Sequence, residues 1–186
     1  MDDETFPLVV SLACHDLRTP LATIFGFART LNRMEEQDER TARFLGMIED
    51  ASDQMTGLLD GLGTIARIQA DRWEPALREV DIAELVATED ARVRVEGSGE
   101  AIETEADAVG KALQSLALAA LRHGPVDSVT WTVHGRELEL RPVTDAAAPV
   151  LTGGEVRDLG SLVARAVIER LGGSLVCVGD ALHVSL

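Results

Sequence analysis

A histidine and a threonine four residues apart, His15 and Thr19, are the strongest candidates for catalytic side chains. They lie in the segment Cys14-His15-Asp16-Leu17-Arg18-Thr19-Pro20-Leu21. Residues four apart share one face of an α-helix, and the apolar positions around them fall on another face. His15 is therefore predicted to face outward. A neutral imidazole is a usable nucleophile at pH 7, and the carboxylate of Asp16 can orient the ring and favour its phosphorylated form. A solvated surface histidine is the alternative interpretation.

Two long helices are predicted to carry this segment and pack beside it. Apolar residues recur at spacings of three and four through residues 6–34 and again through residues 40–70, which indicates a helical hairpin. The apolar stripes are too wide for one antiparallel neighbour to cover, so a homodimer forming a four-helix bundle is expected. The stripe of the first helix consists of Val9, Ala13, Leu17, Leu21, Ile24, Ala28 and Leu31.

After residue 72 the period changes to short alternating segments separated by helical patterns. Strands are predicted at 92–95, 129–133, 137–140, 175–178 and 182–186, and helices at 82–88, 106–122 and 159–171. The pattern predicts an α+β protein, with a helical hairpin in residues 1–72 and a small two-layer α/β sandwich in residues 73–186.

Composition excludes several classes of protein and partner. The 186 residues carry 17 basic and 32 acidic side chains, for a net charge of −15, and only six aromatic residues. Nucleic acid is not expected as a partner, because phosphate binding needs a basic patch. No stretch is apolar enough for a membrane span, and a cytoplasmic location is expected. Cys14 and Cys177 have no metal-binding spacing and are expected to be buried, reduced thiols.

The segment from His15 to Leu21 closely resembles the H-box of sensor histidine kinases, whose usual form is HE/DLRTPL. Family-like sequence continues at residues 67–73 and 80–86. The resemblance implies that residues 1–72 form a dimerisation and histidine-phosphotransfer domain. It further implies that His15 is the phosphoacceptor, that Asp16 is its acid/base partner, and that Thr19 aligns water for phosphatase action on a response regulator.

Residues 73–186 resemble the ATP-binding domain of the same family, but several of the residues that define its nucleotide-binding motifs are replaced. Residues 112–123 overlay the asparagine box NLLxNAxKH, with Ser115 and Ala119 in place of the asparagines. An alanine methyl offers no oxygen to Mg²⁺. Residues 143–151 overlay the DxGxG box and keep Asp145 without its glycines.

The third nucleotide motif is shortened as well. Only twelve residues separate Asp145 from Asp158, and residues 157–162 replace the GxGLGL turn with a single glycine, Gly160. The degenerate nucleotide site would therefore lie near Ser115, Ala119, Asp145, Asp158 and Gly160. The resemblance implies that the fold was kept and its ligand lost, so no bound cofactor is expected.

Three functions remain after these comparisons of motifs. The leading hypothesis is a dimeric histidine phosphotransferase that exchanges a phosphoryl group between His15 and response-regulator receiver domains, which supply the Mg²⁺. The second is a divergent ATP-dependent histidine kinase or response-regulator phosphatase, or a fragment of a longer sensor. The third is a non-catalytic pseudokinase scaffold that binds response regulators.

The remaining histidines give weaker signals. His123 ends a predicted helix before Gly124-Pro125, where a cationic residue ordinarily caps the helix C-terminus. His134 and His183 lie in separate predicted strands without a nearby acidic or cysteine partner in the sequence. No metal site is expected from this spacing.

Overall fold

The computed structural model describes residues 5–33 and 38–186, without the side chains of residues 5–9, 11–13, 16 and 32. The chain divides into two units, Met1–Arg72 and Trp73–Leu186.

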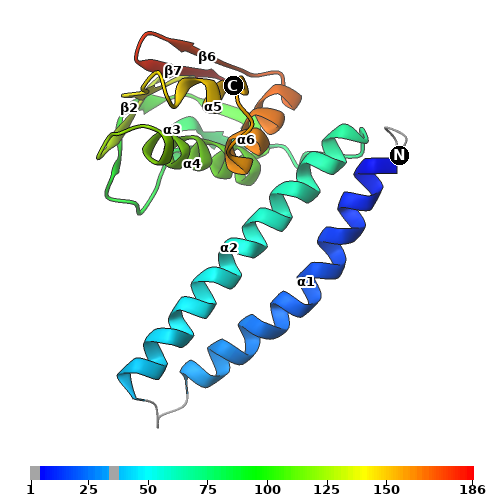
Figure 1. The fold of residues 1–186 in the computed structure, drawn as a ribbon. Helices are drawn as coiled ribbons and strands as arrows, with labels where there is room; N and C mark the ends of the chain where they lie inside the picture. Colours follow the sequence, from blue (N-terminus) through cyan, green and yellow to red (C-terminus); the bar gives the residue numbers. More distant parts are fainter. Residues whose placement is uncertain (1–4, 34–37) are drawn as a thin grey trace. The chain divides into compact units, whose positions relative to one another are not determined.

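The first unit is a hairpin of two long antiparallel helices, α1 (Thr5–Asn32) and α2 (Glu39–Gln69) (Figure 1). The side chain of Asp38 caps α2 by accepting a hydrogen bond from the backbone N–H of Thr41 at 2.7 Å. Soon after α2, Asp71 adopts a left-handed conformation with φ of 52°, which ends the helical path. Both predicted helices are confirmed to within about three residues at each end.

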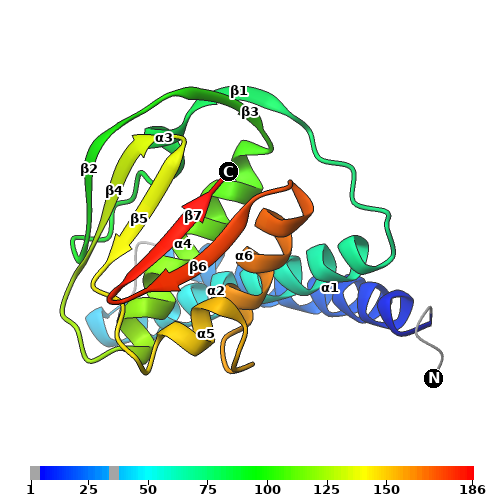
Figure 2. The ribbon, with the colours of Figure 1, turned by 90° about the horizontal axis from the view of Figure 1, so that it is seen from above.

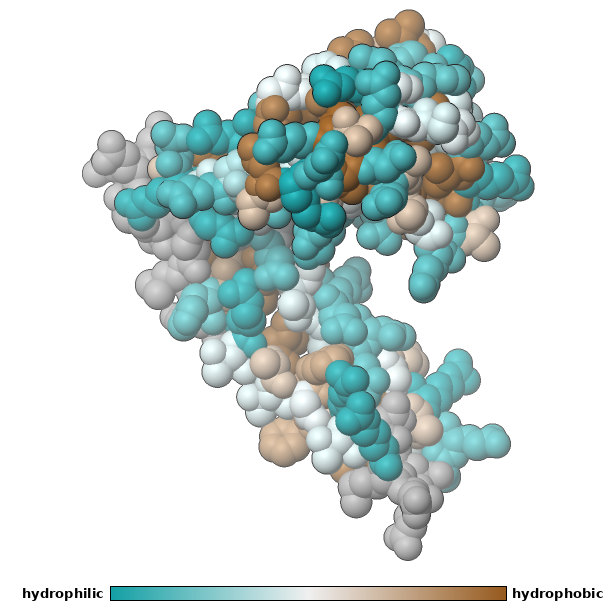
Figure 3. Space-filling model, turned by 180° about the vertical axis from the view of Figure 1, so that it is seen from behind, coloured by the Kyte–Doolittle hydropathy of each residue, from teal (hydrophilic) through white to brown (hydrophobic). Residues whose placement is uncertain are grey.

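The apolar stripe predicted for α1 does not form one buried surface. Leu21 and Ala28 are buried in the hairpin, but Leu17 is 55% exposed, Ile24 is 50% exposed and Leu31 is 47% exposed. Two antiparallel helices cover only a narrow strip of each other, so the remaining apolar side chains reach the surface. Figure 3 shows apolar side chains at the surface of the hairpin, between polar ones. The others on the hairpin are Phe27, Phe44, Met47, Ile48, Met55 and Leu58.

The second unit is a two-layer sandwich of a mixed sheet and helices (Figure 2). The five-stranded sheet has the order β2-β4-β5-β7-β6, in which β2 and β4 are parallel and the other pairs are antiparallel. Its strands are β2 (Val93–Gly99), β4 (Val129–Gly135), β5 (Glu137–Arg141), β6 (Ser174–Val178) and β7 (Ala181–Ser185). The two main helices, α4 (Ala106–His123) and α6 (Leu159–Arg170), pack side by side against one face. The predicted α+β class is confirmed.

Four short elements complete this unit. They are β1 (Arg78–Asp81), β3 (Ala101–Thr104), α3 (Ile82–Leu85) and α5 (Ala148–Thr152). Strands β1 and β3 form a separate two-stranded sheet. The elements β1, β3 and α5 were not predicted. Strands β1 and β3 each carry one large apolar side chain, Val80 and Ile102, and α5 is too short to show a helical period.

The core lies between the sheet and the helices. Val129, Trp131 and Val133 alternate inward along β4 and are buried, as are Leu113 and Leu116 on α4. Strands β4 and β5 alternate buried residues with more exposed ones, so the other face of the sheet remains accessible. Among the described residues, no helix is long and apolar enough to cross a membrane.

Candidate functional site

His15 lies in the first half of α1 and is exposed, as predicted from helical periodicity. It lines an open hollow of about 470 Å³ together with Arg18, Thr19, Ala22 and Thr23. The structure therefore places His15 and Thr19 on one accessible face of the helix. The side chain of Asp16 is outside the described part of the structure, so its predicted partnership with His15 stays a prediction.

The side chain of Arg18 connects this face to the second helix. A guanidinium nitrogen of Arg18 lies 2.7 Å from Oδ1 of Asp60 on α2, and both side chains are about half exposed. Exposed ion pairs of this kind contribute only about 0–1 kcal/mol to stability. The pair therefore contributes little to the stability of the hairpin. Its main effect is to hold the Arg18 guanidinium beside the hollow that contains His15.

The residues that overlay the nucleotide motifs lie in the second unit. Ser115 and Ala119 lie on α4, half-buried and buried, and Asp145 is exposed in the turn before α5. Gly160 lies in the first turn of α6 and approaches α4 closely. A Cβ atom added to Gly160 would lie 3.2 Å from Cβ of Ser115, so α6 packs directly against the asparagine-box position.

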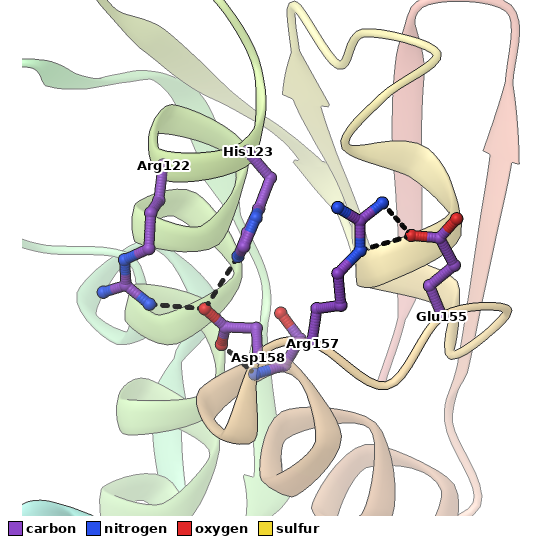
Figure 4. A network of polar contacts seen from close by, with 6 residues as sticks. Arg122, His123, Glu155, Arg157 and Asp158 are labelled. Atoms are coloured by element: carbon purple, nitrogen blue, oxygen red, sulfur yellow. Dashed lines mark hydrogen bonds and ion pairs between the residues drawn. The ribbon is translucent and has the colours of Figure 1, made fainter.

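Asp158 forms the N-cap of α6 and is the centre of a polar cluster with Arg122, His123 and Ser161, here called the Asp158 cluster (Figure 4). Its Oδ1 accepts a hydrogen bond from the backbone N–H of Ser161 at 2.9 Å. Its Oδ2 lies 3.2 Å from Nε2 of His123 and also accepts a hydrogen bond from the Arg122 guanidinium. The Asp158 side chain is only 3% exposed.

The environment of Asp158 favours its ionised form. Burial alone would raise the pKa of this carboxyl, but the Ser161 N–H, His123 and Arg122 together outweigh burial. The pKa of Asp158 is therefore held below its ordinary value. The cluster is expected to remain intact throughout the neutral pH range.

The cluster corrects the prediction for His123. The backbone N–H of Gly124, not the His123 side chain, closes the end of α4 by donating to the carbonyl of Ala120. His123 instead reaches the carboxylate of Asp158, 35 residues further along the chain. The spacing of residues along a helix predicts contacts only between side chains about one turn apart, so the sequence alone does not indicate this contact.

We expect acidification to destabilise the second unit of the wild-type chain more than that of Asp158→Asn. A carboxyl whose pKa is lowered on folding stabilises the fold above its unfolded value of about 3.9, and this contribution is lost as the pH falls below that value. Urea unfolding at pH 7 and pH 3 measures the difference. Trp73 and Trp131, the two tryptophans of the chain, both lie in the second unit, so their fluorescence reports on it alone.

The exposed Asp145→Asn variant is the matched control for this measurement. It should show the same loss of stability between the two pH values as the wild type. An identical loss in Asp158→Asn would contradict the assignment, since other carboxyls would then account for all of the acid sensitivity.

The other two histidines face the open side of the sheet. His183 lies opposite Glu139 in the β5–β7 register, and its Nδ1 is 3.7 Å from Oε2 of Glu139. A hydrogen bond from Arg141 is the main cause of the lowered pKa of Glu139.

Within residues 5–33 and 38–186, no group of three or more His, Cys, Asp or Glu side chains could hold a metal ion. Cys14 is buried as predicted, but Cys177 is only half-buried, and burial raises the pKa of its thiol.

Comparisons with known proteins agree with the helical hairpin. Residues 8–71 match the His Kinase A (phospho-acceptor) domain. The sensor protein KdpD of Mycobacterium tuberculosis, in strains CDC 1551 / Oshkosh and ATCC 25618 / H37Rv, is 29% identical over 210 residues. That similarity covers 93% of this chain and 24% of KdpD, so the chain spans about a quarter of these relatives.

Two solved structures share the fold at 18% sequence identity. Full-length ShkA in complex with AMPPNP superposes with a TM-score of 0.66, over 96% of this chain and 44% of ShkA. The histidine kinase AdeS of Acinetobacter baumannii superposes with a TM-score of 0.53, over 91% of this chain and 94% of AdeS. The hairpin of α1 and α2 is therefore the part of the chain that matches a phospho-acceptor domain. The chain as a whole is similar to sensor histidine kinases in sequence and in fold.

Proposed function

We propose that this chain is a dimeric histidine phosphotransferase that exchanges a phosphoryl group between His15 and response-regulator aspartates without using ATP. The proposal rests on a contrast between the two units. His15 of the H-box is accessible. In the region that overlays the nucleotide motifs, α6 packs against Ser115 and the Asp158 carboxylate caps the N-terminus of α6. The similarity of the hairpin to a phospho-acceptor domain supplies the reaction class.

In the proposed step, a ring nitrogen of His15 attacks the phosphorus of a receiver aspartyl phosphate. A nitrogen–phosphorus bond forms, the acyl phosphate oxygen–phosphorus bond breaks, and the aspartate leaves as a carboxylate. Phosphoryl transfer depends mainly on positioning and on stabilising charge at the phosphoryl oxygens. The receiver supplies Mg²⁺, and Arg18 supplies a positive charge beside the hollow.

The second unit supports the absence of ATP from this reaction. Backbone N–H groups at a helix N-terminus are an ordinary place for phosphate, but at α6 the Asp158 carboxylate accepts one of them. Ala119 is buried and offers no oxygen to a cation. Asp145, which overlays the DxGxG aspartate, is exposed, while Ala147, Val150 and Leu151 beside it are buried.

A second copy of the hairpin is proposed to cover the apolar surface of the first unit. An apolar groove of about 310 Å³ runs between α1 and α2. It continues the exposed apolar positions of both helices, which would otherwise remain in water. Its lining residues are Leu17, Pro20, Leu21, Ile24, Met55, Leu58 and Leu59.

Millimolar Mg-ATP is expected to leave the melting temperature of the chain unchanged. A ligand present at a hundred times its dissociation constant stabilises the folded state by about 2.7 kcal/mol, which a thermal shift assay detects readily. Tryptophan fluorescence is the appropriate signal, because both tryptophans lie in the nucleotide-domain-like unit. A clear rise in the melting temperature, with micromolar affinity by calorimetry, would contradict the proposal and favour an ATP-dependent kinase.

Asp16 and Thr19 are expected to affect different activities. Asp16→Asn should slow phosphoryl acceptance by about 10² or more, because general acid/base catalysis typically contributes that much. Thr19→Ala should leave acceptance nearly intact and lower hydrolysis of a phosphorylated receiver, since its hydroxyl shares the His15 face and can place a water. Thr23→Ala, in the same hollow one turn further on, is the matched control and should change neither rate.

Acid-labile phosphate on the chain, measured after incubation with phosphorylated receivers, tests the proposal. Labelling is the expected result. Receiver binding without labelling would overturn it and favour the scaffold hypothesis. Labelling only from Mg-ATP would favour the kinase hypothesis, for which the KdpD similarity is the supporting observation.

A further inference from the structure

Arg18 is the one side chain with a permanent positive charge among the described residues that line the hollow of His15. It also forms one end of the ion pair that joins the two helices of the hairpin, because its Nη2 lies 2.7 Å from Oδ1 of Asp60 on α2. Asp60 itself does not line the hollow. The carboxylate of Asp60 is therefore connected to the hollow through the Arg18 guanidinium.

The Arg18 guanidinium is suited to bind the oxygens of a phosphoryl group on its way to His15. The two residues are three apart on α1, so their side chains are neighbours on the helix surface. A guanidinium carries several N–H donors in one plane, and within the described residues Asp60 accepts from one of them. Donors therefore remain for a second anionic group.

The contact with Asp60 restricts where the guanidinium lies. A half-exposed arginine has large rotamer entropy, and a partner on the same helix would move with it. Asp60 belongs to the other helix, so it gives the guanidinium a fixed point outside α1. Charge on the phosphoryl oxygens is stabilised best by donors that are already in place. A guanidinium held beside His15 meets this requirement better than one that samples many rotamers.

We infer that Asp60 is a positioning residue for phosphoryl transfer to His15, and that it acts by holding the Arg18 guanidinium beside the hollow. The inference rests on the proposed role of His15 as phosphoryl acceptor, and it assigns a residue of α2 to the same site. Because Asp60 does not line the hollow, its effect passes through Arg18.

Phosphoramidate, a small phosphoryl donor, tests the inference in the full chain without a receiver. A ring nitrogen of His15 attacks its phosphorus, a new nitrogen–phosphorus bond forms, the bond to the amino nitrogen breaks, and ammonia leaves with the electron pair. The initial rate of phosphohistidine formation at His15 is measured by mass spectrometry under alkaline conditions. His134, an exposed histidine of the second unit, is the reference within the same chain.

Arg18→Ala is expected to slow labelling of His15 by about tenfold or more, because hydrogen bonds from a charged donor are among the stronger ones. Asp60→Ala should slow it by about two- to fivefold, since an exposed ion pair shifts the position of the guanidinium by no larger factor. Asp60→Glu, which keeps a carboxylate at this position, should retain most of the wild-type rate. Labelling of His134 should not change in any variant.

The double variant distinguishes positioning from an independent effect of Asp60. In a chain that already carries Arg18→Ala, Asp60→Ala should change the rate no further, because a residue that acts through Arg18 cannot act in its absence. Asp53→Ala is the matched control, since Asp53 is an exposed carboxylate seven residues earlier on α2. It should label like the wild type.

Three results would overturn the inference. The first is labelling of His15 in Asp60→Ala that is as fast as in the wild type, or faster. The second is an effect of Asp60→Ala that persists in full beside Arg18→Ala. The third is a wild-type chain in which His134 is labelled and His15 is not. Helical circular dichroism confirms the fold, which alanine at an exposed helix position should not disturb.

These outcomes are separate from those that decide the proposed function. A chain that shows the expected dependence on Asp60 with phosphoramidate, but takes no phosphoryl group from any receiver, would support the inference and contradict the proposed function. A chain that receivers label equally well with and without Asp60, and that phosphoramidate labels equally well, would do the reverse.

Discussion

His15→Ala is expected to abolish labelling of the chain by a phosphorylated receiver. The imidazole is the nucleophile in the proposed step, and no neighbouring group in the hollow, which also contains Arg18, Thr19, Ala22 and Thr23, can replace it at neutral pH. The substitution should not harm the fold, because His15 is exposed and alanine is the best helix former. Acid-labile phosphate per chain, with receiver binding measured in parallel, is the readout.

His123→Ala is the matched control for this prediction. It removes a histidine from the second unit, where the ring contacts Asp158, and should leave labelling intact. Labelling of His15→Ala, or equal loss of receiver binding in both variants, would mean that His15 is not the chemical centre.

Leu58→Asp is expected to dissociate the dimer while leaving the hairpin of each chain folded. Leu58 is 44% exposed in the single chain, so an aspartate there costs the isolated hairpin little. In the dimer it would replace a buried leucine and bury a charge, which together should raise the dissociation constant by more than about 100-fold. Light scattering at micromolar concentration measures the change in mass.

The matched control is Leu77→Asp, a leucine exposed to a similar degree in the second unit. It should leave the dimer intact. A wild-type chain that is monomeric at micromolar concentration would contradict the prediction without any variant.

The helices and long strands were predictable because their periods extend over enough residues to be recognised. The spacing of three and four through α1 and α2, and the alternation of Val129, Trp131 and Val133 in β4, gave element types that the structure confirms. The strands β1 and β3 were not predictable in the same way, because each carries only one large apolar side chain and its pairing partner is distant in the sequence.

The candidate site was predictable where one helix carries it and unpredictable where tertiary packing assembles it. His15 and Thr19 share a face because they are one turn apart, which the sequence shows directly. The Asp158 cluster joins α4 to α6 across more than thirty residues, so only the fold reveals it. The loss of glycines and asparagines was visible in the sequence, but the carboxylate that takes their place was not.

One experiment with two phosphoryl donors tests whether His15 accepts its phosphoryl group from a receiver or from ATP. The wild-type chain is incubated either with a phosphorylated receiver without ATP or with Mg-ATP without a receiver, and phosphohistidine is located by mass spectrometry under alkaline conditions. We expect phosphohistidine at His15 from the receiver and none from Mg-ATP. Phosphohistidine at His15 from Mg-ATP alone, or no phosphohistidine from any phosphorylated receiver that binds the chain, would contradict the proposed phosphotransferase function.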